Sequence, residues 1–484
     1  MRTSLAVMKW KEARTVTDAQ AIVPIGCSRS TLCFAAAFVW ALGFVTSSAN
    51  DAIPGAPQTV PVALVGGTLH PVSGPPIVGG TILFEAGKIV ELGVDVELSA
   101  ATVVVDVSGR HVYPGLFAAH SHLGLVEIAS VRGTLDTSES GDFNPNLEAQ
   151  RSVQPDSEIL PVTRSGGVLL ALTAPRGGRI AGMAAVLQLD GWTYEDMTLA
   201  SRTALVMAWP KVPPVLENPS SPTDGEAPDK RKAGANADAG GVELLALRRF
   251  FDDARAYEKA RLAHREGNAS AGAEPASDAR LAALGPVLRR EVPILVEANE
   301  LSRIQSAVAF AVGQDVRLIL LGGYDAPACA ELLRRHDVAV IVSAVHRLPQ
   351  RRDDPYDAAY TLPERLRASG VRYCISCSDR SIAANVRNLP HHAATAVAFG
   401  LPPEEALKAI TLYPARILGV EERVGSLETG KDATVIVTTG DPLQMTTRVE
   451  AAYIQGRAVD LSDRQKRLYE KYREKYRRLR PAER

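Results

Sequence analysis

The chain has 484 residues, of which 46% are hydrophobic and 5% aromatic, and its formal net charge at pH 7 is −1. A near-neutral chain with few aromatic residues has neither the overall field nor the stacking platforms that a nucleic-acid partner requires, and its net charge does not attract an anionic membrane. The length is sufficient for one barrel-sized domain and a smaller second domain.

The N-terminus resembles an export signal. An apolar run over residues 32–45 follows Arg29 and precedes the small residues Ser47 and Ala49. Such a run is short for a membrane span, and small residues in this position are typical of a signal-peptidase site. We therefore expect residues 1–49 to be a signal peptide and the protein to be periplasmic or extracellular. No stable membrane insertion is expected after cleavage, and a retained anchor is the alternative.

Two histidines end the first long apolar strand of the chain. Short β-branched runs separated by glycine turns occupy residues 60–110, and the next run, 112–122, ends in His120 and His122. Side chains two residues apart on a strand point to the same face. Both imidazoles can therefore reach one metal ion, which makes the pair a candidate metal site.

The central part of the chain alternates between strand and helix patterns. A flexible insertion is expected at 215–240, where Pro, Ser, Asp, Gly and Ala dominate, and a helix is expected at 242–265. Alternating apolar strands and helices predict a parallel α/β sheet, and eight such units predict a (β/α)8 TIM-type barrel with its site at the carboxyl ends of the strands. The eight predicted strands are 112–122, 166–173, 183–190, 203–210, 293–298, 316–323, 338–345 and 371–379.

The C-terminal part returns to β patterns before a final helix. Segments 425–438 and 449–460 could complete the sheet begun at 60–110. A basic helix is expected within 462–484, and because Glu470 and Glu474 interrupt its positive charge, a surface helix is favoured over a nucleic-acid arm.

Four motifs follow one another in a characteristic order. They occupy residues 113–122, 182–191, 404–419 and 425–433. With these motifs, the chain resembles the amidohydrolase superfamily from about 60 to 460, and in particular its imidazolonepropionase-like branch of secreted bacterial members. The resemblance implies a barrel over 112–418 and a composite β-sandwich domain formed from both chain ends, 58–111 and 419–461. It also implies a divalent metal and hydrolysis of a C–N bond in a small molecule, such as a cyclic amide.

The resemblance also implies a ligand set. In the family, the metal is held by the first-strand His pair, by histidines ending strands five and six, and by an aspartate ending strand eight. His120, His122 and Asp379 match the first and last of these positions, whereas Glu297 stands at the end of strand five and Gly322 at the end of strand six. Carboxylate oxygen binds zinc as well. We therefore expect His120, His122, Glu297 and Asp379 to hold one ion, zinc, rather than two.

A hydrolytic mechanism follows from this set. A bound divalent metal lowers the pKa of its water and polarises the scissile carbonyl, and Asp379 would act as the catalytic proton acceptor. His346, at the end of strand seven, is a candidate substrate contact. The alternative is an inactive amidohydrolase-fold protein with a binding or scaffold role, because two family ligands are replaced. The partner is expected to be a small-molecule substrate, and a homo-oligomer is left open.

Overall fold

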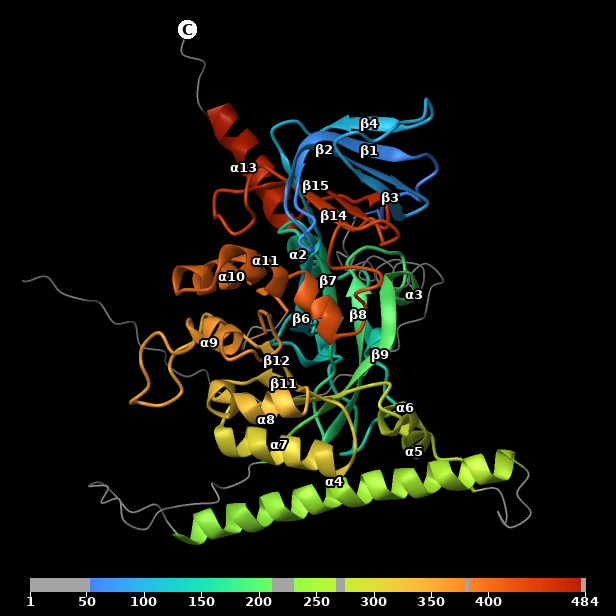
Figure 1. Ribbon diagram of the computed structural model, residues 1–484, viewed down its shortest axis with the longest axis vertical. Coiled ribbons are helices and arrows are strands. Elements are labelled where there is room, and N and C mark those ends of the chain that lie inside the picture. The colour runs from blue at the N-terminus through green and yellow to red at the C-terminus, as the bar shows by residue number, and fades with distance from the viewer. Residues whose placement is uncertain (1–52, 211–229, 267–274, 379–382, 480–484) are drawn as a thin grey trace, which may run out of the picture. The chain divides into compact units, whose positions relative to one another are not determined.

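The computed structural model describes residues 53–210, 230–266, 275–378 and 383–479 (Figure 1). The predicted signal peptide, most of the predicted insertion, and Asp379 lie outside these residues. The strands of the described part form two eight-stranded sheets in a mixed α/β fold. The first sheet is nearly closed and barrel-like, and it carries the site.

The barrel sheet contains all eight strands predicted for it, hydrogen-bonded in chain order. Ser376 follows the last strand and brings it to the first, because its hydroxyl accepts from the His120 amide at 3.1 Å and donates to the His120 carbonyl at 2.9 Å. The strands are β6 (Leu116–Ser121), β7 (Val168–Thr173), β8 (Ile180–Gln188), β9 (Thr198–Met207), β10 (Ile294–Ala298), β11 (Leu318–Gly322), β12 (Ala339–Val342) and β13 (Tyr373–Ile375).

The prediction of a fully parallel sheet is wrong for one strand, which runs in the opposite direction. Strand β8 runs antiparallel to both β7 and β9, while the remaining neighbours are parallel. Only residues 174–179 join β7 to β8, and a parallel connection needs a crossover of about a dozen residues or more. The expectation of eight βα units is therefore wrong at this point, where the chain makes a β-meander instead.

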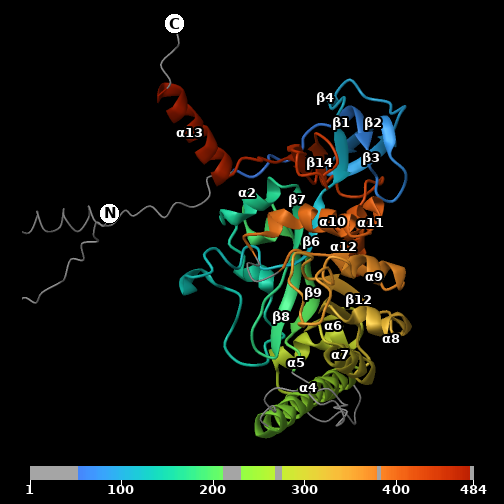
Figure 2. The ribbon, with the colours of Figure 1, turned by 90° about the vertical axis from the view of Figure 1, so that its left-hand side faces the viewer.

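Helices pack against the outer side of the barrel, away from β8 (Figures 1 and 2). In α7, for example, Ile304, Ala307, Val308 and Ala311 are buried, at the spacing of one helical face. These outer helices are α7 (Leu301–Gly313), α8 (Ala330–Arg335), α9 (Leu362–Ala368), α10 (Leu389–Ala398) and α11 (Pro403–Ala409). Helix α12 (Leu412–Ile417) instead packs Ala415 and Ile417 against the residues of the barrel interior. Shorter elements are α2 (Ile159–Arg164), α3 (Tyr194–Met197), α5 (Ala279–Ala283), α6 (Gly285–Leu288), η1 (Arg132–Thr134), η2 (Ala149–Ser152), η3 (Ala326–Cys329) and η4 (Val386–Asn388).

The helix after the predicted insertion is longer than expected. Helix α4 (Lys230–Arg265) begins 12 residues before the predicted start, inside the segment expected to be flexible. The sequence there is rich in Ala and Gly, which offers no apolar periodicity to mark a helix. Further along, Leu247, Phe251 and Ala254 are buried at helical spacing and hold α4 on the core.

The second sheet combines both ends of the described chain. Strand β14 pairs antiparallel with β5, so the predicted completion of the N-terminal sheet by the C-terminal segments is confirmed. That this sheet forms a two-layer sandwich stays a prediction. The order is β16 (Arg457–Ala458), β15 (Val449–Ile454), β14 (Val435–Thr438), β5 (His111–Pro114), β1 (Val62–Leu69), β2 (Ile77–Glu85) and β3 (Lys88–Gly93), with β4 (Val103–Asp106) on β1.

The segment predicted as one strand, 112–122, crosses from one sheet to the other. It divides at Gly115 into β5 of the second sheet and β6 of the barrel. The Gly115 amide donates to the Thr434 carbonyl, and a Cβ at this position would lie 2.9 Å from the Leu169 Cβ. The two sheets are therefore linked covalently at Gly115, five residues before the first site histidine, His120.

Candidate active site

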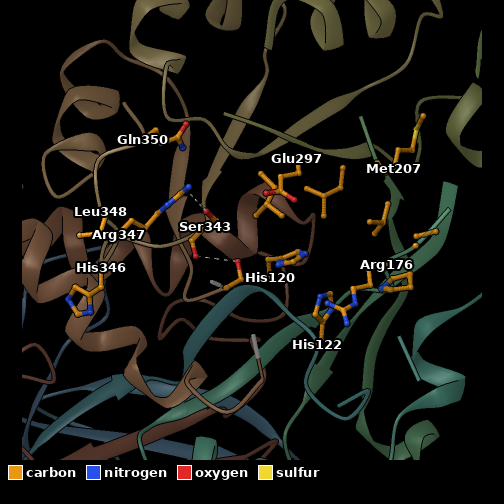
Figure 3. Close-up of a pocket in the computed structure, with 18 of the residues that line it drawn as sticks. His120, His122, Arg176, Met207, Glu297, Ser343, His346, Arg347, Leu348 and Gln350 are labelled. Atoms are coloured by element: carbon orange, nitrogen blue, oxygen red, sulfur yellow. Dashed lines mark hydrogen bonds between the residues drawn. The ribbon is translucent and has the colours of Figure 1, made fainter. Parts of the chain in front are cut away.

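A cavity of about 830 Å³ opens at the carboxyl ends of the barrel strands (Figure 3). It contains four of the predicted site residues, His120, His122, Glu297 and His346, and it is large enough for a small organic ligand. Other lining residues come from the β7–β8 turn, from β9 and β11, and from the segments after β12 and β13: Arg176, Met207, Leu321, Ser343, Arg347, Gln350 and Ser378.

A bulge in β6 directs the histidines into this cavity. Phe117 and Ala119 face the barrel interior, so strict alternation would turn His120 outward. The pairing of β6 with β7 shifts register between Ala118 and Ser121. Irregularities of this kind re-aim side chains, and here the shift brings His120 and His122 to the same inner wall.

His120 is buried and neutral at physiological pH. The residue is 6% exposed, and among the described residues its Nδ1 has no hydrogen-bond partner. Burial, with a smaller contribution from the neighbouring His122, lowers its pKa to about 3. A histidine must be unprotonated to ligate a metal. Buried polar atoms are normally hydrogen-bonded, so a buried Nδ1 without a partner among the described residues is a candidate ligand atom.

His122 is held in one orientation. Its Nδ1 lies 2.5 Å from the carbonyl oxygen of Ala174, which assigns the ring proton to Nδ1 and leaves the Nε2 lone pair available. Burial lowers its pKa to about 4; the positive charge of Arg176 acts in the same direction, and the bond to Ala174 opposes both. The centroids of the His120 and His122 rings are 5.5 Å apart.

Glu297 lies across the cavity from the histidine pair (Figure 3). It follows Leu295 by two residues on β10, so both face the barrel interior, and Glu297 is the exposed member of an otherwise buried strand. Within the described part of the chain, no three His, Cys, Asp or Glu side chains are close enough together to hold a metal. Two nitrogen donors are thus assembled and one carboxylate shares their cavity, while Asp379 lies outside the described residues.

Comparisons with known proteins agree with this barrel fold. Residues 320–461 match the model of the Amidohydrolase family. An amidohydrolase structure from Thermotoga maritima MSB8 superimposes with a TM-score of 0.70 and 26% identity, covering 82% of this chain and 99% of that one. The chain is thus similar to amidohydrolases in sequence over its C-terminal part and in fold over most of its length.

Two curated relatives match the chain over different lengths. Amidohydrolase tasK of Hapsidospora irregularis is 25% identical over 415 residues, 78% of this chain and 40% of that protein. The chain therefore spans less than half the length of that relative. A 38-residue stretch is 55% identical to the imidazolonepropionase of Erwinia tasmaniensis, covering 8% of this chain and 9% of that enzyme.

His346 also lines the cavity. Its Nε2 is 2.7 Å from the Thr395 hydroxyl, and its ring lies against His392 with centroids 4.1 Å apart. These contacts turn the ring toward α10. Its predicted role as a substrate contact stays a prediction.

His392, which sequence reasoning passed over, is the centre of a buried network. Its Nδ1 accepts from the Val345 amide at 3.0 Å, so Nε2 carries the proton and donates to the Cys377 sulfur at 3.2 Å. The thiol in turn donates to the Asn385 carbonyl at 3.2 Å. The network joins the segment after β12, the segment after β13 and helix α10, directly behind the cavity wall.

Two arginines were also missed. Arg347 donates to the Ser343 hydroxyl at 3.1 Å, and Arg176 donates through Nε to the Thr137 hydroxyl at 3.2 Å. Within the described residues neither forms an ion pair with a carboxylate. Each directly follows a barrel strand, β12 or the end of β7, so proximity to a strand's carboxyl end was the signal that could have found them. Both place positive charge in the cavity.

Proposed function

We propose that this protein is a metal-dependent hydrolase that cleaves a C–N bond in a small, amide-like substrate. The observation that carries the proposal is the orientation of His122 by Ala174 beside the neutral, buried His120, at the carboxyl end of the first barrel strand. A metal-ligating histidine typically donates its other ring nitrogen to a carbonyl in this way. The similarity of the chain to amidohydrolases in sequence and fold supports the same interpretation.

The donor set is chemically suited to one divalent ion. His120 and His122 would hold it, with Glu297 and Asp379 as the carboxylates, and zinc suits nitrogen and oxygen donors. Such an ion, when bound, supplies a water of lowered pKa and polarises a carbonyl. Asp379 would receive the proton of that water and return it to the leaving nitrogen, a role that rests on its place in the sequence.

The remaining cavity residues indicate the substrate class. Arg176 and Arg347 present guanidinium groups whose described side-chain partners are neutral: the hydroxyls of Thr137 and Ser343 and the amide oxygen of Asn299. Guanidinium binds carboxylate through paired hydrogen bonds. Met207 and Leu321 contribute apolar surface to the same cavity. We infer an amide, cyclic or peptide-like, that carries a carboxylate group. We further propose that the protein is exported and acts in the periplasm or outside the cell.

Metal analysis of the purified protein tests the proposal. Wild-type protein is expected to retain about one equivalent of zinc after dialysis, and His120→Ala is expected to lose it. His336→Ala, on an exposed helix end, is the matched control and is expected to keep the metal. Turnover is then sought with dipeptides and cyclic amides in the presence of zinc or manganese.

Metal content below stoichiometry and unchanged by His120→Ala would contradict the proposal. That result, together with ligand binding but no turnover, would favour the alternative of an inactive fold with a binding role.

A further inference from the structure

The charge of this chain is unevenly distributed. Helix α13 (Arg464–Leu479) carries eight basic and two acidic residues, a net charge of +6 within 16 residues, although the whole chain carries −1. An average near zero therefore conceals one strongly basic element. What that element can bind depends on how its charges are arranged around the helix.

The helix has one face without charge. At 100° per residue, an arc of about 100° contains Leu468, Leu479 and three tyrosines, together with Gln465, and no charged residue falls within it. The tyrosines are Tyr469, Tyr472 and Tyr476. Tyrosine combines an apolar ring with a polar tip, which suits it to the boundary between an apolar layer and water.

Basic residues border this arc on both sides. Arg464 and Lys475 follow one edge, and Lys466 and Arg473 follow the other, while the two glutamates lie on the opposite face of the helix. The ammonium of Lys475 lies 5.9 Å from the centroid of the Tyr472 ring, and the guanidinium of Arg473 lies 5.8 Å from that of Tyr469. The long basic side chains thus reach toward the aromatic arc from its edges.

The arc is open to solvent. No residue of α13 is buried, and Tyr469, Tyr476 and Leu479 are each more than 60% exposed. The helix is anchored at its first turn, where the Asp463 carboxylate accepts from the Lys466 amide and Arg467 pairs with Glu158 at 3.3 Å. Beyond this turn it extends away from β15 and β14 (Figures 1 and 2).

We propose that α13 binds the surface of a bilayer that contains anionic phospholipid, with its tyrosine arc at the headgroup boundary and its basic edges on lipid phosphates. Helices that lie in the membrane interface have a basic polar face and a separate apolar or aromatic face. Clustered Lys and Arg residues are attracted to anionic headgroups. None of the described helices is long and apolar enough to cross a membrane, which is consistent with binding at the surface.

The basic residues on both edges of the tyrosine arc disfavour binding partners other than an anionic bilayer. A second copy of α13 packed arc to arc would bring basic edges against basic edges, and like charges at such a seam are repulsive. A nucleic-acid duplex would contact the basic edges through its phosphates and leave the tyrosines and leucines between those edges facing phosphate. An anionic plane with an apolar layer beneath it satisfies both parts of the helix surface.

Vesicle flotation with the full chain tests this inference. Vesicles of phosphatidylglycerol and phosphatidylcholine in equal parts are compared with pure phosphatidylcholine. Binding is expected to the first and not to the second, and to weaken as the Debye length falls from about 10 Å at 0.1 M salt to about 3 Å at 1 M. Replacing Arg464, Lys466, Arg473 and Lys475 together by Gln is expected to lower the association constant about tenfold or more.

Two further variants distinguish the contribution of the tyrosine side chains to binding from the contribution of charge. The triple change Tyr469→Ser, Tyr472→Ser, Tyr476→Ser leaves the charge unaltered and is expected to weaken binding to the anionic vesicles. The matched control, with Arg290, Arg335, Arg372 and Arg416 replaced by Gln, removes the same charge from exposed positions elsewhere and is expected to bind as wild type. Residues 1–52 are identical in all variants, so any membrane affinity of that segment cancels.

Equal binding to neutral and anionic vesicles would overturn the proposal, as would equal loss in the α13 and control variants. So would a shift in sedimentation from dimer to monomer in the tyrosine variant without a change in lipid binding, since the arc would then belong to a second copy. Matching circular dichroism and thermal unfolding of all variants shows that the fold is intact.

Discussion

The imidazole of His122 is anchored by Ala174, whose carbonyl oxygen lies 2.5 Å from Nδ1 at the end of the neighbouring strand. Because β7 supplies this carbonyl, the orientation of a side chain on β6 depends on the pairing of the two strands. The ring is thereby prepared for a ligand before one arrives, which reduces the cost of ordering it on binding.

His122→Asn tests this anchoring. The asparagine amide can still donate to the Ala174 carbonyl, but it has no equivalent of Nε2. Zinc affinity, measured by competition with a chelator, is expected to fall more than about tenfold, while the thermal unfolding temperature changes little. An unchanged zinc affinity would show that Nε2 of His122 is not a ligand.

Stability is expected to depend on pH through His392. Burial, with contributions from the positive charges of His346 and His391, lowers its pKa in the folded protein to about 3, below the unfolded value of about 6.5. Between these values the unfolded state binds more protons, so the free energy of unfolding falls as the pH is lowered from about 6.5 and is level above it.

Urea unfolding at pH 7 and pH 5 measures this dependence. Wild type is expected to lose stability at pH 5, at about 1.4 kcal/mol per pH unit from this group. His392→Gln is expected to be less stable at pH 7 by about 1–3 kcal/mol, because the Val345 amide and the Cys377 thiol lose a partner, and to show a shallower pH dependence. The exposed His336→Gln serves as control; a slope equal to wild type in His392→Gln would reject the assignment.

Arg347 is expected to select acidic substrates. Arg347→Met removes the charge while keeping length, so the KM of a carboxylate-bearing substrate should rise about tenfold or more, with a smaller change in kcat. The corresponding substrate with a neutral carboxamide should be affected little. Equal effects on both substrates would indicate that Arg347 supports the cavity wall and does not bind the carboxylate.

Gly115 is expected to be required at the junction of the two sheets. A Cβ there would lie 2.9 Å from the Leu169 Cβ, so Gly115→Ala should lower the free energy of unfolding by about 1–3 kcal/mol. Gly74→Ala is the matched control, because no atom lies within 4 Å of the added Cβ. Equal urea midpoints for the two variants would contradict this steric account.

The strands of the barrel could be predicted because each is a short apolar run with its own local pattern. The direction of β8 was missed because side-chain periodicity does not encode strand direction; the six-residue connection 174–179 does. The early start of α4 at Lys230 was missed because small residues carry no periodic signal. Local sequence therefore predicts the existence of elements better than their direction or ends.

The site could be predicted only where its members are neighbours in sequence. His120 and His122 share one strand, so their proximity follows from chain geometry, although the face they occupy depends on the bulge in β6. Arg347 meets them only through closure of the barrel, and His392 becomes buried only when α10 packs behind β12. Such contacts join distant segments, and a single sequence carries no direct record of them.

The pairing of β5 with β14 also has a consequence for synthesis. His111 of β5 pairs with Thr438 of β14, 327 positions later. Strand β5 therefore cannot form this pairing until β14 has been synthesised and has left the ribosome. Until then β5 presents an unpaired edge, which is the kind of surface that chaperones shield from aggregation. Completion of this sheet is therefore a late event in the synthesis of the chain, and a stop codon before Val435 would leave β5 without its antiparallel neighbour β14.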